Sequence, residues 1–410
     1  MNATNTFFEE LENENISGVA YKNLDLKKKT IGHFANIGNA TIADLCKELN
    51  ASAPKVTTLI NDLIKEGLVK DYGKIDSTGG RRPNLYGLAS ESGFFLGVEV
   101  RKYHVSIGLL DFKKNLVKVT EKIPYRLFNT MDSLDELCSI IQKFINEQPI
   151  SKDKILGMGI NLSGRVNFAT GYNYNSFYFS NDEPLSKIME SKVGIKTLIE
   201  NDSRAMAYGE YCSGSVGEEK NVLFVNLDYG IGMGILINGQ LYYGKSGYSG
   251  EFGHIPFFNN EILCHCGKKG CLETEASGDA LLKLFIKKIE EGSSSIAMRN
   301  KKLEEIRLDD ILQAAINDDV LAIELLEQIG EKIGRGVALL INLFNPEMVV
   351  LGGMIASTGN YIQLPIKSAL NKYSLSLVNN DTQLTISTLG AKAGIVGASL
   401  LARNMTLSIG

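Results

Sequence analysis

The sequence predicts an α/β protein with a small helical segment at its N-terminus and a larger body made of two similar halves. Three observations lead to this fold class. Apolar residues recur at helical spacing in residues 24–64, strand-like and helical runs alternate beyond Ser90, and an apolar strand–turn–strand pattern occurs twice, at 94–111 and 221–240. A chain of 410 residues with 44% hydrophobic content is long enough to fold into more than one domain.

Two short helices are expected first. Helical spacing between residues 24 and 37 stops at Gly38, which ends the first helix. Thr41, followed three residues later by Asp44, resembles a capping box and predicts a second helix that ends at Asn50.

The third helix is expected to begin at Ser52, with the serine hydroxyl as its N-cap. Pro54 lies in the first turn, where the missing N–H is tolerated, and apolar residues continue at helical spacing up to Gly67. Strands are expected at 68–70 and 84–88, around a turn-rich stretch. Three helices followed by a hairpin predict a winged helix-turn-helix.

The predicted domains are an N-terminal segment (1–20) that is a polar arm or an irregular helix, the winged helix-turn-helix (21–90) and an α/β body (91–410). In the body, the repeated strand–turn–strand pattern predicts two related lobes. This resembles sugar kinases and actin-like proteins, which duplicate a ribonuclease H-like fold and have a cleft between the lobes.

Charge and cysteine usage exclude several classes. No uninterrupted apolar run is long enough to span a bilayer and the N-terminus is acidic, which favours a cytoplasmic protein without a membrane partner. Six cysteines are too few for a disulfide scaffold in a chain of this length. Residues 21–88 carry eleven basic and seven acidic residues. Residues 1–20 and residues 89–410 each carry a net charge of −4. Such a balance is expected if only the N-terminal part contacts nucleic acid.

The winged helix-turn-helix offers two surfaces for DNA. One face of the third helix carries hydroxyls, an amide and a cation that suit phosphates and base edges in a major groove. The stretch Gly79-Gly80-Arg81-Arg82-Pro83 places two guanidinium groups at a tip that suits a narrow minor groove. A solvated helix face and a flexible linker are the alternatives. The residues predicted to contact DNA are Ser52, Lys55, Thr57, Thr58, Asn61, Lys74, Arg81 and Arg82.

A metal site is predicted in the second half of the body. Cys264, Cys266 and Cys271 follow His254, and the glycines among them permit a knuckle that brings the thiolates together. One histidine and three cysteines form a closed tetrahedral set, which is typical of structural Zn²⁺ and leaves no open position for catalysis. Free buried cysteines are the alternative. His265 is expected to be a solvated loop residue.

Around this site the sequence resembles the ROK family, whose name combines repressors, open reading frames and sugar kinases. The resemblance rests on Glu251-Phe252-Gly253-His254, the cysteine knuckle and Leu272-Glu273. It extends to residues 200–205, 228–234, 352–353 and 394–398. The winged helix with its arginine tip is similar to that of the repressor branch.

The resemblance implies a sugar in the cleft between the lobes, held through its hydroxyls. Carboxylates accept hydrogen bonds from hydroxyls, and an amide both donates and accepts. One ring nitrogen of His254 would bind the metal while the other faces the sugar. The residues implied as sugar ligands are Ser163, Gly164, Asn201, Asp202, Glu251, His254 and Glu273.

The family kinases bind phosphate with two glycine-rich segments, which we call the first and second phosphate grips. The sequence departs from these kinases at one of them. The aspartate that serves those kinases as a base is present as Asp202, and the second glycine-rich grip is kept at 230–234. The first grip is replaced by the bulky residues 99–104, so we expect no ordered ATP binding, no enzyme activity and only a vestigial base. Side chains of Arg101 and Lys102 that bind phosphate are the alternative.

Together these features predict a homodimeric or homotetrameric repressor of carbohydrate-utilisation genes. A sugar or sugar-phosphate effector would control its binding to operator DNA. Two alternatives stay open: an ATP-dependent sugar kinase with a regulatory DNA-binding head, and a sensor controlled by a protein partner.

Overall fold

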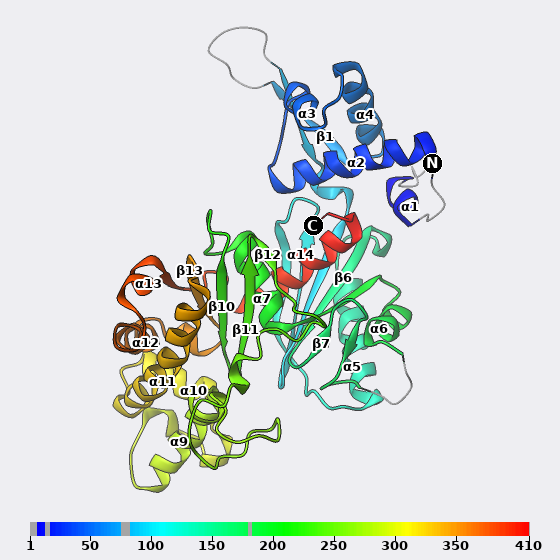
Figure 1. Cartoon of the computed structure of the whole chain (residues 1–410). Helices are drawn as coiled ribbons and strands as arrows, with labels where there is room; N and C mark the ends of the chain where they lie inside the picture. The colour runs from blue at the N-terminus through cyan, green and yellow to red at the C-terminus, as the bar shows by residue number, and fades with distance from the viewer. Residues whose placement is uncertain (1–5, 13–16, 75–82, 179–182, 410) are drawn as a thin grey trace. The chain divides into compact units, whose positions relative to one another are not determined.

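The computed structural model describes residues 6–12, 17–74, 83–178 and 183–409 of the chain (Figure 1). Two compact units are present. Unit 1 comprises Met1–Ile160, Ser186–Leu198 and Ala398–Gly410, and unit 2 comprises Asn161–Leu185 and Ile199–Gly397. Among the described residues, every helix is either too short or too polar to cross a bilayer.

The predicted winged helix-turn-helix is present in unit 1. Its helices are α2 (Gly18–Asn36), α3 (Ile42–Glu48) and α4 (Ala53–Lys65), and its hairpin pairs β1 (Val69–Lys74) with β2 (Asn84–Leu88). The apolar residues that predicted the helices form their buried faces. Helix α2 begins six residues before the predicted start, because residues 18–23 are exposed and their apolar side chains do not follow helical spacing.

The two predicted helix caps have different outcomes. The capping box is confirmed, since the Asp44 N–H donates to the Thr41 hydroxyl and the Thr41 N–H donates to the Asp44 carboxylate. The prediction that the Ser52 hydroxyl caps α4 is wrong, because that hydroxyl makes no capping hydrogen bond. Pro54 in the first turn has no N–H, which removes one of the donors that such a cap uses.

A short helix lies in the segment predicted as a polar arm or an irregular helix. Helix α1 (Thr6–Glu12) places Phe7 fully buried in a hydrophobic cluster. This cluster joins the winged helix to the adjoining sheet, since Phe95 and Phe112 belong to it as well. The ammonium group of Lys27 in α2 also holds α1, through an ion pair with Glu10 at 3.1 Å.

The first five-stranded sheet lies mostly in unit 1 and has the order β5-β4-β3-β6-β9, with the ends of β6 and β9 belonging to unit 2. Helices α5 (Met131–Asn146) and α6 (Leu185–Val193) pack together beside it, with Cys138 against Met189 (Figure 1). The bounds of the strands are β3 Phe94–Val100, β4 His104–Asp111, β5 Leu116–Pro124, β6 Ile155–Leu162 and β9 Thr197–Asn201.

The second sheet, in unit 2, repeats the same topology. Its order is β12-β11-β10-β13-β14, so both sheets read third, second, first, fourth and fifth strand in chain order. In each, the first two strands form an antiparallel hairpin, which confirms the repeat predicted from the sequence. The bounds of the strands are β10 Val222–Leu227, β11 Ile231–Ile237, β12 Gln240–Leu241, β13 Met348–Gly352 and β14 Gln383–Ile386.

Both faces of the second sheet are covered, as the nearly continuous apolar run in β10 requires. Leu223 and Val225 pack into a core with α11 (Val320–Phe344), whereas Val222 and Phe224 point to the other face, toward α7 (Asp202–Ser213).

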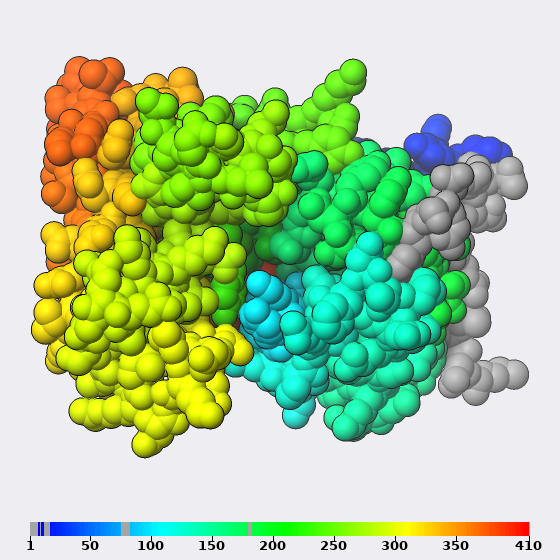
Figure 2. Space-filling view, turned by 90° about the horizontal axis from the view of Figure 1, so that it is seen from below, coloured from blue at the N-terminus to red at the C-terminus, as the bar shows by residue number. Residues whose placement is uncertain are grey.

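The other elements surround these sheets. Helices α9 and α10 lie at the surface of unit 2, where they form part of the face seen in yellow-green and yellow (Figure 2). The remaining strands and α-helices are β7 Val166–Asn167, β8 Tyr172–Asn173, α8 Glu273–Ala276, α9 Gly278–Glu290, α10 Leu308–Ile316, α12 Asn360–Tyr373, α13 Ser376–Asp381 and α14 Ala393–Leu407. The 3₁₀ helices are η1 Ser90–Ser92, η2 Lys152–Lys154, η3 Phe252–His254, η4 Ile296–Met298, η5 Leu303–Glu305, η6 Ile355–Thr358 and η7 Gly390–Lys392.

Candidate functional site

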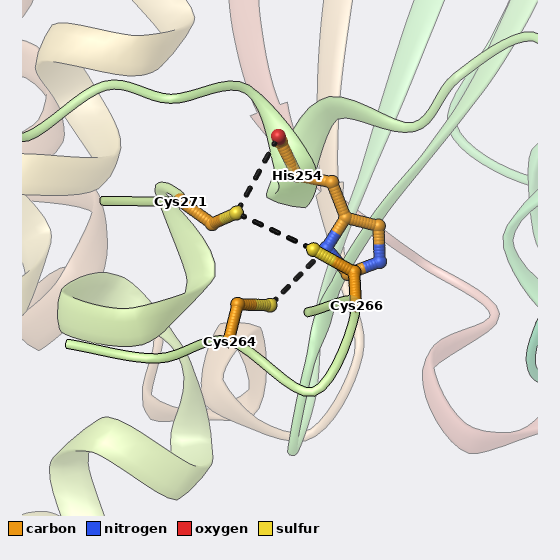
Figure 3. Close-up of side chains that lie close together, drawn as sticks. All are labelled: His254, Cys264, Cys266 and Cys271. Carbon is orange, nitrogen blue, oxygen red and sulfur yellow. Dashed lines mark hydrogen bonds between the residues drawn. The ribbon is translucent and has the colours of Figure 1, made fainter. Parts of the chain in front are cut away.

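The four predicted metal ligands converge in unit 2 (Figure 3). His254 ends η3, and the three cysteines lie on the loop that follows. Their ligand atoms all lie within 4.8 Å of one another. Gly267 and Gly270 adopt positive φ angles of 84° and 73°, which a glycine adopts without strain and which let the loop fold back on itself.

The spacing of the ligand atoms fits a tetrahedral zinc ion. Zn–S bonds of about 2.3 Å and Zn–N bonds of about 2.0 Å place ligands about 3.8 Å apart for two sulfurs and about 3.5 Å apart for sulfur and nitrogen. The Sγ atoms of Cys266 and Cys271 are 3.7 Å apart, and Sγ of Cys264 lies 3.5 Å from Nδ1 of His254. The donor types and the distances therefore both suit this ion.

The thiols of the cluster differ in acidity. Burial raises the pKa of Cys264 to about 12, and burial also raises the pKa of Cys271. Burial acts in the same direction on Cys266, but hydrogen bonds from the Lys268 backbone and from the neighbouring thiols outweigh it and lower the pKa. Metal binding must therefore displace protons from at least two of the three thiols.

Glu273 links this cluster to the glycine loop of the second sheet. Its Oε2 accepts a hydrogen bond from the N–H of Ile231 at 3.1 Å, and its Oε1 lies 3.9 Å from Nδ1 of His254. His265 is an exposed loop residue as predicted, with 70% of its side chain accessible. Its ring nevertheless has a neighbour that was not predicted, since Nδ1 lies 3.1 Å from Glu273.

Two of the implied sugar ligands lie where β9 meets α7. Asn201 caps the helix, because its Oδ1 accepts a hydrogen bond from the Arg204 N–H, and its Nδ2 donates to the carbonyl of Gly164 at 3.0 Å. Asp202 accepts a hydrogen bond from the N–H of Ser203 at 2.7 Å. Both side chains are partly accessible, so each keeps capacity to bind hydroxyls.

Glu251 connects these residues to the metal cluster. One of its carboxylate oxygens lies 3.9 Å from Nε of Arg165 and 3.8 Å from Nε2 of His254. Nδ1 of the same histidine faces Cys264, so the two ring nitrogens point to different partners. All seven residues implied as sugar ligands belong to unit 2 and form a chain of neighbours from Gly164 to Glu273.

A buried arginine that sequence reasoning missed organises this region. Arg204 donates to the carboxylate of Glu200 at 2.7 Å and to two backbone carbonyls, those of Gly247 at 2.7 Å and Val166 at 3.0 Å. It thereby joins α7 to the segment before Glu251 and to β7. Sequence inspection gave no signal for this role, because both carbonyls lie about forty residues away along the chain.

A second group that sequence reasoning missed comprises the aromatic side chains of residues 168–178. Residues 168–178 contain five aromatic residues among eleven, far above the 8% of the whole chain. That local density is a signal in the sequence. In the structure several of these rings contact one another and Tyr248.

The hairpin that replaces the first phosphate grip is held by its own charges. The carboxylate of Glu99 is buried and pairs with Nη2 of Arg101 at 3.0 Å. In the second glycine loop, the glycines serve packing, since a Cβ atom on Gly234 would lie 2.3 Å from the Cβ of Ala207 in α7.

The predicted DNA-contacting face is exposed along α4. Its members in the described residues are Ser52, Lys55, Thr57, Thr58, Asn61 and, at the end of β1, Lys74, all accessible. The hydroxyls of Thr57 and Thr58 donate to helix carbonyls one turn earlier, which leaves their lone pairs for incoming donors. Arg81 and Arg82 lie outside the described residues.

Comparison with known proteins extends over nearly the whole chain. The profile of the ROK family matches residues 95–405. The xylose repressor of Bacillus subtilis is 30% identical over 378 residues, which cover 92% of this chain and 94% of that protein. A solved ROK family transcriptional regulator, a homolog of the Escherichia coli MLC protein, has a TM-score of 0.78 at 26% identity and covers 94% of this chain and 98% of its own.

A solved kinase matches a shorter part. The ROK family glucokinase of Streptomyces griseus, in complex with glucose and AMPPNP, has a TM-score of 0.69 at 26% identity. The match covers all of that enzyme but 76% of this chain. About a quarter of the chain therefore has no counterpart in the enzyme, whereas the repressor and the regulator match it almost from end to end.

Proposed function

The chain belongs to the ROK family, and from this premise we propose that it is a transcriptional repressor whose binding to operator DNA is controlled by a sugar or sugar phosphate. One observation carries the proposal: a repressor and a transcriptional regulator match 92% and 94% of this chain, whereas the glucokinase matches 76%. The winged helix-turn-helix precedes residue 95, where the match to the family profile begins. The exposed polar face of α4 supplies groups for phosphates and base edges. The domain division proposed with it is an arm (1–20), a DNA-binding head (21–90) and a sensor body (91–410).

The effector binds, in this proposal, to the chain of residues in unit 2. Asp202 and Glu251 accept hydrogen bonds from sugar hydroxyls, and Asn201 both donates and accepts. Gly164 joins them through its carbonyl, which accepts a hydrogen bond from Asn201, and Ser163 precedes it in the chain. A ligand bound there regulates DNA binding only if its affinity differs between the DNA-binding state of the chain and the other state.

We propose further that His254, Cys264, Cys266 and Cys271 hold a structural Zn²⁺ ion. A bound zinc ion would link the ends of this loop and add folding free energy. His254 then presents its Nε2 beside Glu251, while Glu273 ties the same loop to β11. The proposed role of these residues is to orient the sugar ligands.

We propose that the chain does not transfer phosphate. The bulky hairpin with its Glu99–Arg101 pair replaces a glycine-rich grip, and phosphoryl transfer depends on positioned charge stabilisation. Asp202 and the second glycine loop favour the rival function, a sugar kinase. An ADP-release assay over a panel of sugars separates the two, because turnover above background would overturn the proposal.

The repressor function is tested by coupling two measurements on the full chain. A thermal-shift screen with sugars and their 6-phosphates identifies the effector, since a ligand of the folded state raises the melting temperature. Fluorescence anisotropy with operator DNA then measures affinity with and without it. Asp202→Asn and Glu251→Gln should abolish both responses, whereas Glu261→Gln, an exposed carboxylate in the same region, should keep them. An effector that raises the melting temperature but leaves DNA affinity unchanged would contradict the proposal.

A further inference from the structure

Four tyrosines form an exposed aromatic surface on unit 2, which we call the tyrosine platform: Tyr172, Tyr174, Tyr178 and Tyr248. The ring centroid of Tyr174 lies 6.2 Å from that of Tyr172, 5.7 Å from that of Tyr178 and 6.0 Å from that of Tyr248. Tyr174 is 42% exposed and Tyr178 is 52% exposed. Exposed aromatic rings are usually scattered singly over a protein surface. A cluster of them is unusual and indicates a binding surface.

The backbone beneath the platform is well ordered by hydrogen bonds. The N–H of Tyr174 donates to the carbonyl of Arg165 at 3.0 Å, and Asn173 accepts two backbone N–H groups of the turn that follows. Tyr248 reaches the platform because Gly247 packs directly on β7, where a Cβ atom would lie 2.8 Å from the carbonyl oxygen of Val166. Rings held in this way lose little conformational freedom when a ligand binds.

The platform continues into the residues assigned to the sugar. Arg165, which carries the carbonyl bonded to Tyr174, has its Nε atom 3.9 Å from the carboxylate of Glu251. The neighbouring Gly164 is bonded to Asn201. Polar groups that bind hydroxyls and aromatic faces therefore lie side by side within one unit.

This combination suits a carbohydrate longer than one ring. The C–H groups on the face of a sugar ring carry a slight positive charge and meet the negative face of an aromatic ring, while its hydroxyls require donors and acceptors at the edge. The carboxylates and amide of the candidate site would hold one ring. The platform, which is joined to that site through Arg165 and Gly164, would contact the next ring of a glycoside.

We propose that the tyrosine platform is a second sugar subsite, so that the effector is a disaccharide or longer glycoside. The proposal rests on the proposed sugar-responsive function. Tyr174, at the centre of the platform, is the residue expected to stack on the second ring, and Tyr248 and Tyr178 border it.

The test compares monosaccharides with their disaccharides by calorimetry on the full chain: xylose with xylobiose, glucose with cellobiose, and N-acetylglucosamine with chitobiose. For the sugar type that binds, the disaccharide should bind about tenfold more tightly, and Tyr174→Ala should remove about that factor while leaving the monosaccharide affinity unchanged. Tyr174→Phe keeps the ring face and should keep most of the advantage. Tyr373→Ala, at an exposed tyrosine of α12, is the matched control.

A spectroscopic readout tests occupancy of the platform directly. The chain contains no tryptophan, so Tyr174→Trp introduces a single reporter. Its emission should shift with the disaccharide and stay unchanged with the monosaccharide. A monosaccharide that binds as tightly as its disaccharide, or an unchanged emission with bound disaccharide, would overturn the subsite and leave the proposed function standing. Absence of binding by every sugar in both forms, and by every sugar and 6-phosphate of the thermal-shift screen, would overturn the proposed function itself.

Discussion

The guanidinium of Arg204 lies 2.7 Å from the carboxylate of Glu200, and both side chains are almost fully buried. Glu200 and Arg204 flank Asn201 and Asp202 in the sequence, and these two residues are among the proposed sugar ligands. Since the arginine also donates to the carbonyls of Gly247 and Val166, three segments of the site depend on one side chain.

Removing one partner of this pair is expected to be costly. Arg204→Met leaves the buried carboxylate of Glu200 without its counter-charge, so we expect the free energy of unfolding to fall by about 3–5 kcal/mol. The double variant Glu200→Gln/Arg204→Met should lose less than the single one, because no charge is left buried. Urea unfolding of both variants measures the difference, with the half-exposed Arg165→Met as a control. Equal losses in the single variant and the control would contradict this role.

Removal of the metal should destabilise unit 2 and weaken sugar binding together. A metal present at about a thousandfold above its Kd stabilises the fold by about 4 kcal/mol, and a chelator removes that contribution. Cys271→Ser should have the same effect, whereas Cys46→Ser, outside the cluster, should not. Elemental analysis should find one zinc ion per chain. Full thermal stability after complete chelation would argue against a structural metal.

Acid should weaken metal binding. The metal-free cluster holds protons on Cys264 and Cys271, whose pKa values burial raises, and the metal-bound cluster does not. Since the metal-free cluster binds more protons than the metal-bound cluster, the affinity for the metal rises with pH and falls on acidification. The change is about tenfold per pH unit for each proton displaced. Competition with a chromophoric chelator between about pH 6 and about pH 8 measures this slope. A pH-independent affinity would mean that thiolates are not the ligands.

The exposed face of α4 should determine DNA affinity in two ways. Lys55→Ala should weaken binding to all sequences and reduce the salt slope by about 1, because one phosphate contact is lost. Asn61→Ala should instead alter the preference for operator bases. Lys65→Ala, on the same helix and with 79% of its side chain exposed, is the matched control. Affinity measured at several salt concentrations distinguishes the two effects.

The arginine tip is tested by Arg81→Ala/Arg82→Ala. Unchanged affinity for operator DNA in this double variant would exclude a contact between the tip and DNA.

The elements predicted correctly from the sequence are those with a local signal. Periodic apolar residues gave the helices of the head, Thr41 and Asp44 gave a capping box, and cysteine spacing gave the metal cluster. Arg204 was missed because its partners, such as Gly247, lie far away in the sequence and tertiary packing alone brings them close. The tyrosine platform did leave a local signal, the aromatic density of residues 168–178, but its contact with Tyr248 also depends on tertiary packing.

The N-terminal helix shows the same limit and yields the last prediction. The segment around Phe7 contains three glutamates and looks polar, yet Phe7 is fully buried in the cluster that joins the winged helix to β3 and to Phe112. Phe7→Ala opens a cavity there and should lower the free energy of unfolding by about 3 kcal/mol, while the half-exposed Phe128→Ala should change it by less than about 0.5 kcal/mol. Limited proteolysis should also cleave the variant faster near its N-terminus, since α1 would lose its main apolar anchor. Unchanged unfolding and cleavage would mean that α1 is not a docked part of unit 1.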